Sequence, residues 1–150
     1  MFIKSVLETK GPDLITVSPG DSVYKVAKLF KSERIGFALV DGANKVTVGS
    51  VSERDIVHAM ARHDGSGDLS GLPVTDIMTT NVVTCDIEDT IDQVRQLMTN
   101  NRTRHVVVMD GEAQAQAGIV SIGDIIKHSL DACQVDTSQM RDYITGQGYQ

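Results

Sequence analysis

Apolar and polar residues recur in the same order twice along the chain, in residues 14–64 and in residues 82–131. After a short extended segment, each copy carries apolar residues at the i, i+3, i+4 and i+7 spacing of one helix face. In the first copy, Asp21 or Ser22 stands where it can cap this helix. The apolar residues of the face are Val23, Val26, Ala27 and Phe30, and the second copy has Thr90, Ile91, Val94, Leu97 and Met98 in that role.

Two short apolar runs separated by a turn follow this helix in each copy. They are residues 37–40 and 46–51 in the first copy, and residues 106–109 and 118–120 in the second. Short runs of this kind around Gly or Asn indicate paired strands. Ser52 and Ser121 then occupy the N-cap position of a second helix. Each copy is therefore predicted to form strand, helix, strand, strand, helix.

The two copies align over two blocks of sequence. Residues 16–23 align with 84–91 at an offset of 68, and residues 49–56 align with 118–125 at an offset of 69, so the second copy gains one residue between the blocks. A lone copy of about 50 residues would be only marginally stable by itself, because so short a chain buries a small share of its surface. We therefore expect an α/β (α+β) fold in which two pseudo-symmetric repeats, each a small three-stranded sheet with two helices, pack as one globular unit.

The segments around the copies divide the chain further. Residues 65–73 are rich in Gly and Ser, which favours an exposed connection, and the residues after Pro73 are expected to form a short helix that leads into the second copy. The expected segments are 1–64 for the first motif with the N-terminal segment, 65–73 for the connection, 74–131 for the second motif and 132–150 for a C-terminal tail. We expect a packing or dimer helix in this tail, with a frayed end as the alternative.

The charge balance argues against some partners. Fourteen Lys and Arg against twenty Asp and Glu give a net charge of −6, which opposes attraction to nucleic acid or anionic lipid. No apolar run approaches the roughly 18 residues of a membrane span, and the first residues do not resemble a signal peptide. Cys85 and Cys133 show neither disulfide nor zinc spacing. We expect a cytoplasmic protein that does not bind nucleic acid or membrane.

The polar residues that both copies share are a serine and an aspartate three positions apart. Ser52 is followed by Asp55, and Ser121 by Asp124, each at the end of a predicted strand. On a first helical turn these positions share one face. The carboxylate can accept two hydrogen bonds from a vicinal diol such as a ribose, while the hydroxyl and the helix N-terminus suit an anion. The alternative is that the aspartates only complement the helix dipole, worth about 0.3–1 kcal/mol.

Taken together, the two copies resemble a stand-alone tandem pair of CBS motifs, the cystathionine β-synthase type of regulatory module also called a Bateman module. The resemblance covers about residues 1–130. The matching stretches are residues 15–19, 35–41 and 49–57 in the first copy and residues 76–79, 82–84, 104–110 and 118–125 in the second. Each stretch alone is a weak signal, but their repeated order is strong.

The resemblance implies two clefts for adenosine nucleotides. Asp55 and Asp124 would hold ribose hydroxyls, and Ser52 and Ser121 would reach the ribose or a phosphate. The adenine would be approached largely by backbone groups of the first strand of each copy, at Ile15, Thr16, Val83 and Thr84. Because such pairs commonly join into a flat dimer, a homodimer is expected.

The candidate phosphate ligands differ between the copies. Arg54 stands beside Asp55, whereas Gly123 stands beside Asp124. Arg104 and His105 are the candidates in the second copy, with Arg102 as a further one, and the alignment places Ile35 and Gly36 at the positions of Arg104 and His105. Guanidinium groups pair well with phosphate oxygens, so Arg54 and Arg104 are the leading candidates. Solvated surface arginines are the alternative.

No pattern of a catalytic or metal site is present. The four histidines form no metal-binding spacing, and the chain lacks a P-loop, a nucleophile elbow and a dinucleotide fingerprint. We expect no enzyme and no required cofactor. The expected function is a sensor that binds AMP, ADP, ATP or NAD(H) and signals to a separate, unknown effector protein. The alternatives are a ligand-independent dimerisation or protein-interaction module and, less favoured, an unrecognised enzyme.

Overall fold

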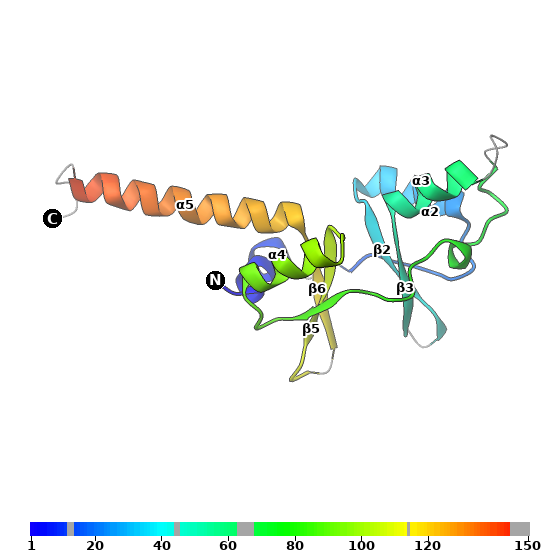
Figure 1. Cartoon of the computed structure of the whole chain (residues 1–150), viewed down its shortest axis with the longest axis horizontal. Helices are drawn as coiled ribbons and strands as arrows, with labels where there is room; N and C mark the ends of the chain where they lie inside the picture. The colour runs from blue at the N-terminus through cyan, green and yellow to red at the C-terminus, as the bar shows by residue number, and fades with distance from the viewer. Residues whose placement is uncertain (12–13, 44–45, 63–67, 114, 145–150) are drawn as a thin grey trace. The chain divides into compact units, whose positions relative to one another are not determined.

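The computed structural model describes residues 1–11, 14–43, 46–62, 68–113 and 115–144. The chain divides into two compact units (Figure 1). The first-repeat unit comprises Asp13–Val82, and the second-repeat unit comprises Met1–Pro12 together with Val83–Gln150. Each unit is built around one copy of the repeat, as the sequence predicts. Residues 63–67, which include the start of the predicted Gly- and Ser-rich connection at residue 65, and residues 145–150 of the tail lie outside the described residues.

The first-repeat unit contains a three-stranded sheet in the order β1-β2-β3. β1 is parallel to β2, and β2 is antiparallel to β3. Its elements are β1 (Thr16–Val17), α2 (Val23–Glu33), β2 (Phe37–Asp41), β3 (Thr47–Ser52), α3 (Glu53–Arg62) and a 3₁₀ turn (Val74–Asp76). The predicted order of elements is confirmed, and the short helix expected after Pro73 is this 3₁₀ turn.

The second-repeat unit repeats this plan with a sheet in the order β4-β5-β6. β4 is parallel to β5, and β5 is antiparallel to β6. Its elements are α1 (Ile3–Lys10), β4 (Thr84–Asp86), α4 (Ile91–Asn100), β5 (His105–Asp110), β6 (Ala115–Ser121) and α5 (Ile122–Ile144). The helix of the second motif continues through the start of the predicted tail as far as Ile144.

The first helix of each repeat begins and ends in the same way. Ser22 accepts a hydrogen bond from the Lys25 amide at the start of α2, and Thr90 forms a capping box with Gln93 at the start of α4. Such caps satisfy amides that would otherwise lack a partner in the first turn. After the helices, Arg34 and Arg102 adopt positive φ angles of 55° and 51°. The shared local geometry confirms that the two copies are one structural motif.

Each unit has its own hydrophobic core, formed where the apolar helix faces meet one face of the sheet. The core of the first-repeat unit contains Val17, Val23, Val26, Phe30, Ala38, Val40, Val51, Ile56, Leu69 and Val74. The core of the second-repeat unit contains Ile3, Val6, Leu7, Cys85, Ile91, Val94, Met98, Val106, Val108, Val120 and Ile125. The helix faces predicted from the i, i+3, i+4 spacing supply much of both cores.

The segment that precedes each copy in the chain packs with the other copy. The Ile3 amide donates to the Asp89 carbonyl oxygen at 2.9 Å in the second-repeat unit, and the Val74 amide donates to the Asp21 carbonyl oxygen at 2.8 Å in the first-repeat unit. These matching bonds make α1 and the 3₁₀ turn structural counterparts. The spatial units therefore differ from the segments 1–64 and 74–131, because α1 buries its apolar face against the second copy.

Membrane insertion through a helix has no support in the described part of the chain. None of its helices combines the length and the apolar character that a membrane span requires.

Candidate functional site

The repeated serine and aspartate pair joins the last strand to the following helix in each unit. In the first-repeat unit, the Ser52 amide and Oγ both donate to Asp55 Oδ2 at 2.8 Å. In the second-repeat unit, the Ser121 amide and Oγ donate to Asp124 Oδ2 at 2.8 and 2.6 Å. The aspartate amide in turn donates to the serine Oγ, at 3.4 Å in the first unit and 3.2 Å in the second. Each pair is therefore a reciprocal helix cap.

The capping role occupies only one oxygen of each carboxylate. All of these hydrogen bonds end on Oδ2, and within the described residues none reaches Oδ1 of Asp55 or Asp124. Both side chains are half-buried. A carboxylate that is held by its helix cap and keeps one oxygen for further acceptance is preorganised to bind a hydroxyl donor.

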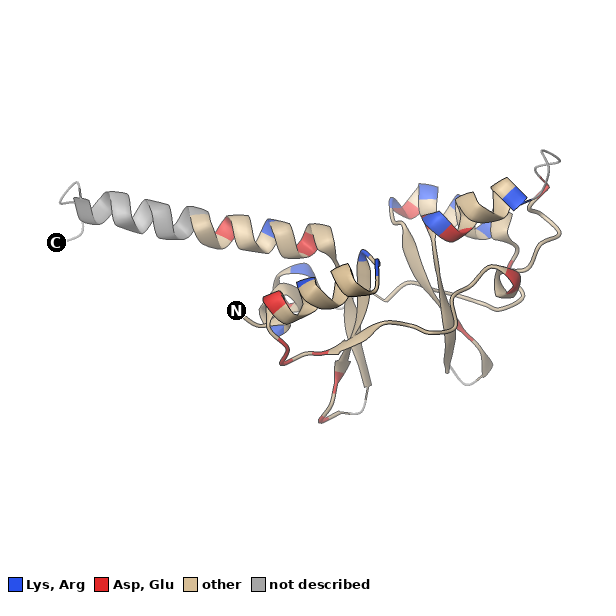
Figure 2. Ribbon diagram, in the orientation of Figure 1, with Lys and Arg blue, Asp and Glu red and all other residues tan. Residues whose placement is uncertain are grey.

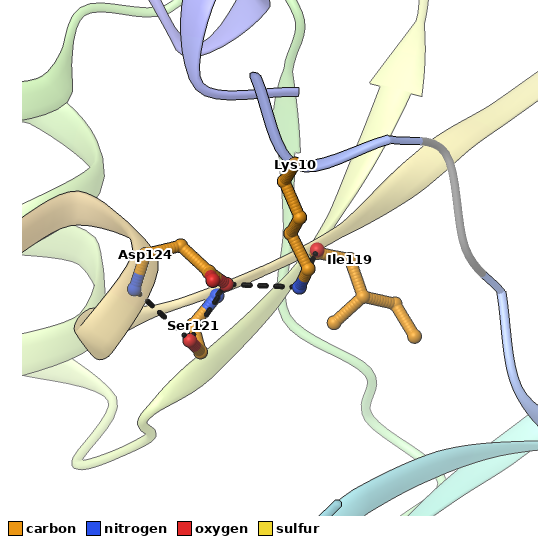
Figure 3. A network of polar contacts seen from close by, with 4 residues as sticks. All are labelled: Lys10, Ile119, Ser121 and Asp124. Atoms are coloured by element: carbon orange, nitrogen blue, oxygen red, sulfur yellow. Dashed lines mark hydrogen bonds and ion pairs between the residues drawn. The ribbon is translucent and has the colours of Figure 1, made fainter. Parts of the chain in front are cut away.

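The side chain of Lys10, the last residue of α1, contacts the carboxylate of Asp124 (Figure 3). Its Nζ is 2.8 Å from Asp124 Oδ2 and 2.9 Å from the Ile119 carbonyl oxygen. Burial raises the pKa of Asp124, but the hydrogen bonds from Lys10 and Ser121 outweigh it and leave the pKa below its ordinary value. Asp124 is therefore ionised at neutral pH and paired with an ammonium group.

The first-repeat unit has a different contact at the equivalent place. Ser50 precedes Ser52 by two residues, as Ile119 precedes Ser121, and its carbonyl oxygen accepts from the Thr79 amide at 2.8 Å instead of from a lysine. The Ser50 amide also donates to the Thr79 carbonyl oxygen at 2.8 Å. No ion pair joins Asp55 to a lysine or arginine in the described part of the chain. The two carboxylates therefore have different electrostatic surroundings.

The residues expected near the adenine lie at the start of β1 and β4. The Ile15 carbonyl oxygen accepts from the Leu39 amide at 3.1 Å, and the Val83 carbonyl oxygen accepts from the Val107 amide at 3.0 Å. Thr16 and Thr84 are exposed and begin the strands that pair in parallel with β2 and β5. The sheet thus uses one acceptor position of each carbonyl oxygen, and the contact with adenine stays a prediction.

The basic candidates occupy different positions in the two units. Arg54 is exposed on the first turn of α3 beside Asp55, and Arg104 is exposed just before β5. His105 lies opposite Ser121 across the sheet. Burial lowers the pKa of His105, and the charge of Lys10 lowers it further, so the imidazole is largely neutral at pH 7. Acidic and basic residues are interspersed on α2 and α3 (Figure 2).

The register of the sheets corrects the alignment of these basic residues. The Glu53 amide donates to the Gly36 carbonyl oxygen, as the Ile122 amide donates to that of Arg104. Ser52 and Ser121 lie opposite Phe37 and His105. Arg104 therefore corresponds to Gly36 and His105 to Phe37, not to Ile35 and Gly36. The sequence alignment matched Asp41 with Asp110, which assumes an offset of 69. The extra residue of the second copy instead lies in the turn after β5, so the offset at Arg104 and His105 is still 68.

In the first-repeat unit, an acidic side chain lies at the position that corresponds to Arg104. A Cβ atom added at Gly36 would lie 2.8 Å from Cδ of Glu53. The side chain of Glu53 therefore folds over the backbone at the position where the second unit carries Arg104. Ile122 replaces Glu53 in the second unit, which leaves that unit without the equivalent carboxylate.

Sequence reasoning missed Lys10 altogether. Lys10 is distant in sequence from Asp124 and has no counterpart in a repeat motif, so no spacing rule connects the two. The available signal was the helical spacing of Ile3, Val6 and Leu7, which predicts that a helix precedes the first copy. Among the described residues, no group of three or more His, Cys, Asp or Glu is arranged to hold a metal ion.

The fold and these pairs define a class of protein, namely a tandem α/β module with a capped carboxylate at the same place in each repeat. The comparison with known families agrees. The model of the CBS domain family matches residues 4–62 and 74–131. The chain therefore belongs to the CBS-domain family, and it contains two CBS domains.

Similar proteins come from bacteria, archaea and plants. A crystal structure of a CBS-domain containing protein from Agrobacterium tumefaciens is 40% identical, with a TM-score of 0.78, and the match covers 84% of this chain and 91% of that one. A CBS domain protein from Pyrobaculum aerophilum, solved in complex with AMP, is 26% identical, with a TM-score of 0.70 over 83% of this chain and 89% of that one. The mitochondrial CBS domain-containing protein CBSX3 of Arabidopsis thaliana is 28% identical over 98% of this chain and 73% of its own length.

Proposed function

We propose that this chain is a regulatory module that binds an adenine nucleotide, namely AMP, ADP, ATP or NAD(H), and performs no catalysis. The observation that carries the proposal is the capped aspartate in each repeat, which keeps Oδ1 available for the hydroxyls of a ribose. The AMP complex of the Pyrobaculum aerophilum relative supports this assignment. In this proposal Asp55 and Asp124 hold ribose hydroxyls, and Ser52 and Ser121 reach the ribose or a phosphate.

The proposed mechanism is a population shift. A nucleotide that binds one conformation of the protein more tightly than another increases the population of that conformation, by no more than its difference in affinity. The signal passes to a separate effector protein, which recognises the favoured conformation.

The direct test is calorimetric titration of the protein with AMP, ATP and NADH. Asp55→Asn and Asp124→Asn keep a side-chain oxygen that can accept the cap from serine, but they remove the charge that strengthens a bond from a ribose hydroxyl. We expect either variant to weaken binding at its own site by about tenfold, because hydrogen bonds to charged groups contribute about 1.5–3 kcal/mol.

Asp89→Asn is the matched control for these variants. Asp89 Oδ2 also accepts a backbone amide, that of Asp86 at 2.8 Å, but it stands before α4, away from the serine and aspartate pair. This variant should bind each nucleotide as the unaltered protein does. If the folded protein, stripped of carried-over nucleotide, bound none of the three compounds, the proposal would be wrong.

The second candidate function is a dimerisation or protein-interaction module that needs no ligand. Two observations favour it. The helix caps already give the repeated serine and aspartate a structural role, and both second helices expose apolar side chains. Val57 and Met60 are 60% and 53% exposed on α3, and Ile126 and Leu130 are 52% and 58% exposed on α5. Because family members of this kind commonly pair, we propose that a second copy of the chain covers these residues, with or without nucleotide.

Negative charges introduced on the exposed apolar residues of α3 and α5 test the proposed homodimer. The double variant Val57→Glu with Ile126→Glu is expected to sediment as a monomer, because burying two unpaired carboxylates in an interface is strongly unfavourable. Val46→Glu, at a residue that is also exposed but follows β2, is the control. Analytical ultracentrifugation would contradict the homodimer if the unaltered protein sedimented as a monomer at all concentrations.

A further inference from the structure

We propose that Lys10 sets the ligand specificity of the Asp124 site: it disfavours an uncharged nucleoside there and favours a nucleoside phosphate, whose oxygens give the ammonium group a new partner. The inference rests on the proposed function and deepens it, since it assigns different ligand preferences to the two carboxylates.

The contact between Lys10 and Asp124 is built into the second-repeat unit. α1 is anchored by Ile3, Val6 and Leu7, which are buried in the core of that unit. The side chain of Lys10 then makes two hydrogen bonds, to Asp124 Oδ2 at 2.8 Å and to the Ile119 carbonyl oxygen at 2.9 Å (Figure 3). Only 31% of this side chain and 26% of that of Asp124 are exposed. Lys10 is thus held at the carboxylate by the fold.

A ribose diol that engages both oxygens of Asp124 must compete with this ammonium group. Asp124 Oδ2 already accepts from the Ser121 amide, Ser121 Oγ and Lys10 Nζ, and the hydrogen bonds from Lys10 and Ser121 lower the pKa of Asp124 despite its burial. A diol that binds both carboxylate oxygens displaces the lysine from Oδ2. An uncharged nucleoside offers nothing in return, so the ammonium group of Lys10 would lose its charged partner and keep only the Ile119 carbonyl oxygen, which is unfavourable.

A nucleoside phosphate supplies the missing partner. If Lys10 moves to a phosphate oxygen, the ammonium group keeps a charge-assisted hydrogen bond while the ribose hydroxyls bind the Asp124 carboxylate. The neighbouring residues agree with an anionic ligand: Arg104 directly precedes His105, which lies opposite Ser121 across the sheet, and the charges of Lys10 and Arg104 both lower the pKa of His105. In the first-repeat unit the counterpart of Arg104 is Gly36, beside the carboxyl group of Glu53. Lys10 and Arg104 therefore have no basic counterpart at Gly36, where the first-repeat unit has the carboxyl group of Glu53 instead.

The test compares adenosine with AMP, which differ only in the phosphate. The titrations use the Asp55→Asn variant as background. This substitution weakens nucleotide binding at the first-repeat site, so that calorimetry reports mainly on the site at Asp124. In this background we expect AMP to bind at least about tenfold more tightly than adenosine. Adding Lys10→Met, which keeps an unbranched side chain of nearly the same length but removes the charge, should weaken AMP binding and strengthen adenosine binding, so that the preference for AMP falls by about tenfold or more.

Two further variants control for charge and for folding. Lys10→Arg, which keeps a cation, should retain the preference for AMP. Lys25→Met removes another close lysine and aspartate pair, Lys25 with Asp21 at 2.6 Å, and should leave the preference unchanged. Thermal unfolding of each variant confirms that the protein titrated is folded.

The outcomes separate this inference from the function on which it rests. An unchanged ratio of AMP to adenosine affinity in Lys10→Met would overturn the role of Lys10 and leave nucleotide binding intact. Loss of all AMP binding in Asp55→Asn would show that the Asp124 site takes no nucleotide; it would overturn the inference and the ribose-binding role of Asp124, and would leave nucleotide binding at Asp55 intact. If the unaltered protein bound neither compound nor any other adenine nucleotide, the proposed function and this inference would both be wrong.

Discussion

Replacing Ile3 by alanine is expected to lower the free energy of unfolding of the second-repeat unit by about 2–5 kcal/mol, the usual cost of removing a large buried aliphatic side chain. Residues this close to a chain end commonly tolerate substitution. Ile3 should not, because its side chain is 0% exposed in the core of that unit and its amide bonds to the Asp89 carbonyl oxygen. Urea denaturation followed by circular dichroism measures the change.

Phe2→Ala is the control for this prediction. Phe2 is the larger residue and stands next to Ile3, but its side chain is 51% exposed, so we expect a loss below about 1 kcal/mol. An equal effect of the two substitutions would show that α1 does not pack with the second repeat in solution. Because Lys10 ends the same helix, Ile3→Ala should also reduce the preference for AMP at the Asp124 site.

Gly49→Ala is expected to destabilise the first-repeat unit by about 3 kcal/mol, at the upper end of what overpacking costs. A Cβ at Gly49 would lie 2.8 Å from the Thr79 carbonyl oxygen and 2.9 Å from Sδ of Met78. The carbonyl group cannot move aside easily, because it accepts the Ser50 amide at 2.8 Å. Relief of the clash therefore requires β3 and the segment after the 3₁₀ turn to separate.

The second repeat supplies the matched control, Gly118→Ala. There the added Cβ would lie 2.8 Å from Cδ2 of Leu7, the end of a side chain. Rotation of Leu7 can relieve this contact without breaking a backbone hydrogen bond, so we expect a loss of about 1 kcal/mol. Chemical denaturation of both variants should rank Gly49→Ala as the more damaging. The reverse order would contradict the close backbone approach at Thr79.

The repeated motif could be predicted because its signals are local. The apolar spacing of Val23, Val26 and Phe30 depends only on the helical period, and the caps at Ser22 and Thr90 depend on residues three positions away. Likewise, the serine and aspartate pairs are three residues apart, so a single helical turn brings them together. For this reason the sequence predicted both the element order and the pairing of Ser52 with Asp55.

The alignment of the basic residues failed because it depends on hydrogen bonds between strands. Asp41-Gly42 and Asp110-Gly111 look equivalent in sequence, yet the pairing of Phe37 with Ser52 and of His105 with Ser121 shifts the correspondence by one residue. A gap in a loop can be placed at several positions by sequence alone. The sheet register selects one of them, and in doing so it places Gly36, beside Glu53, where the second unit has Arg104.

By itself, the sequence determined that two copies of one α/β motif are present and that each holds an aspartate against the start of a helix, because both properties arise from neighbouring residues. Only the tertiary structure decided that α1 belongs to the second copy and that Lys10 reaches Asp124. That choice is made by burial of Ile3, Val6 and Leu7, a contact between distant parts of the chain that no local spacing encodes. It also brings a lysine to the aspartate of one of two similarly folded motifs, and so adds to their difference in charge.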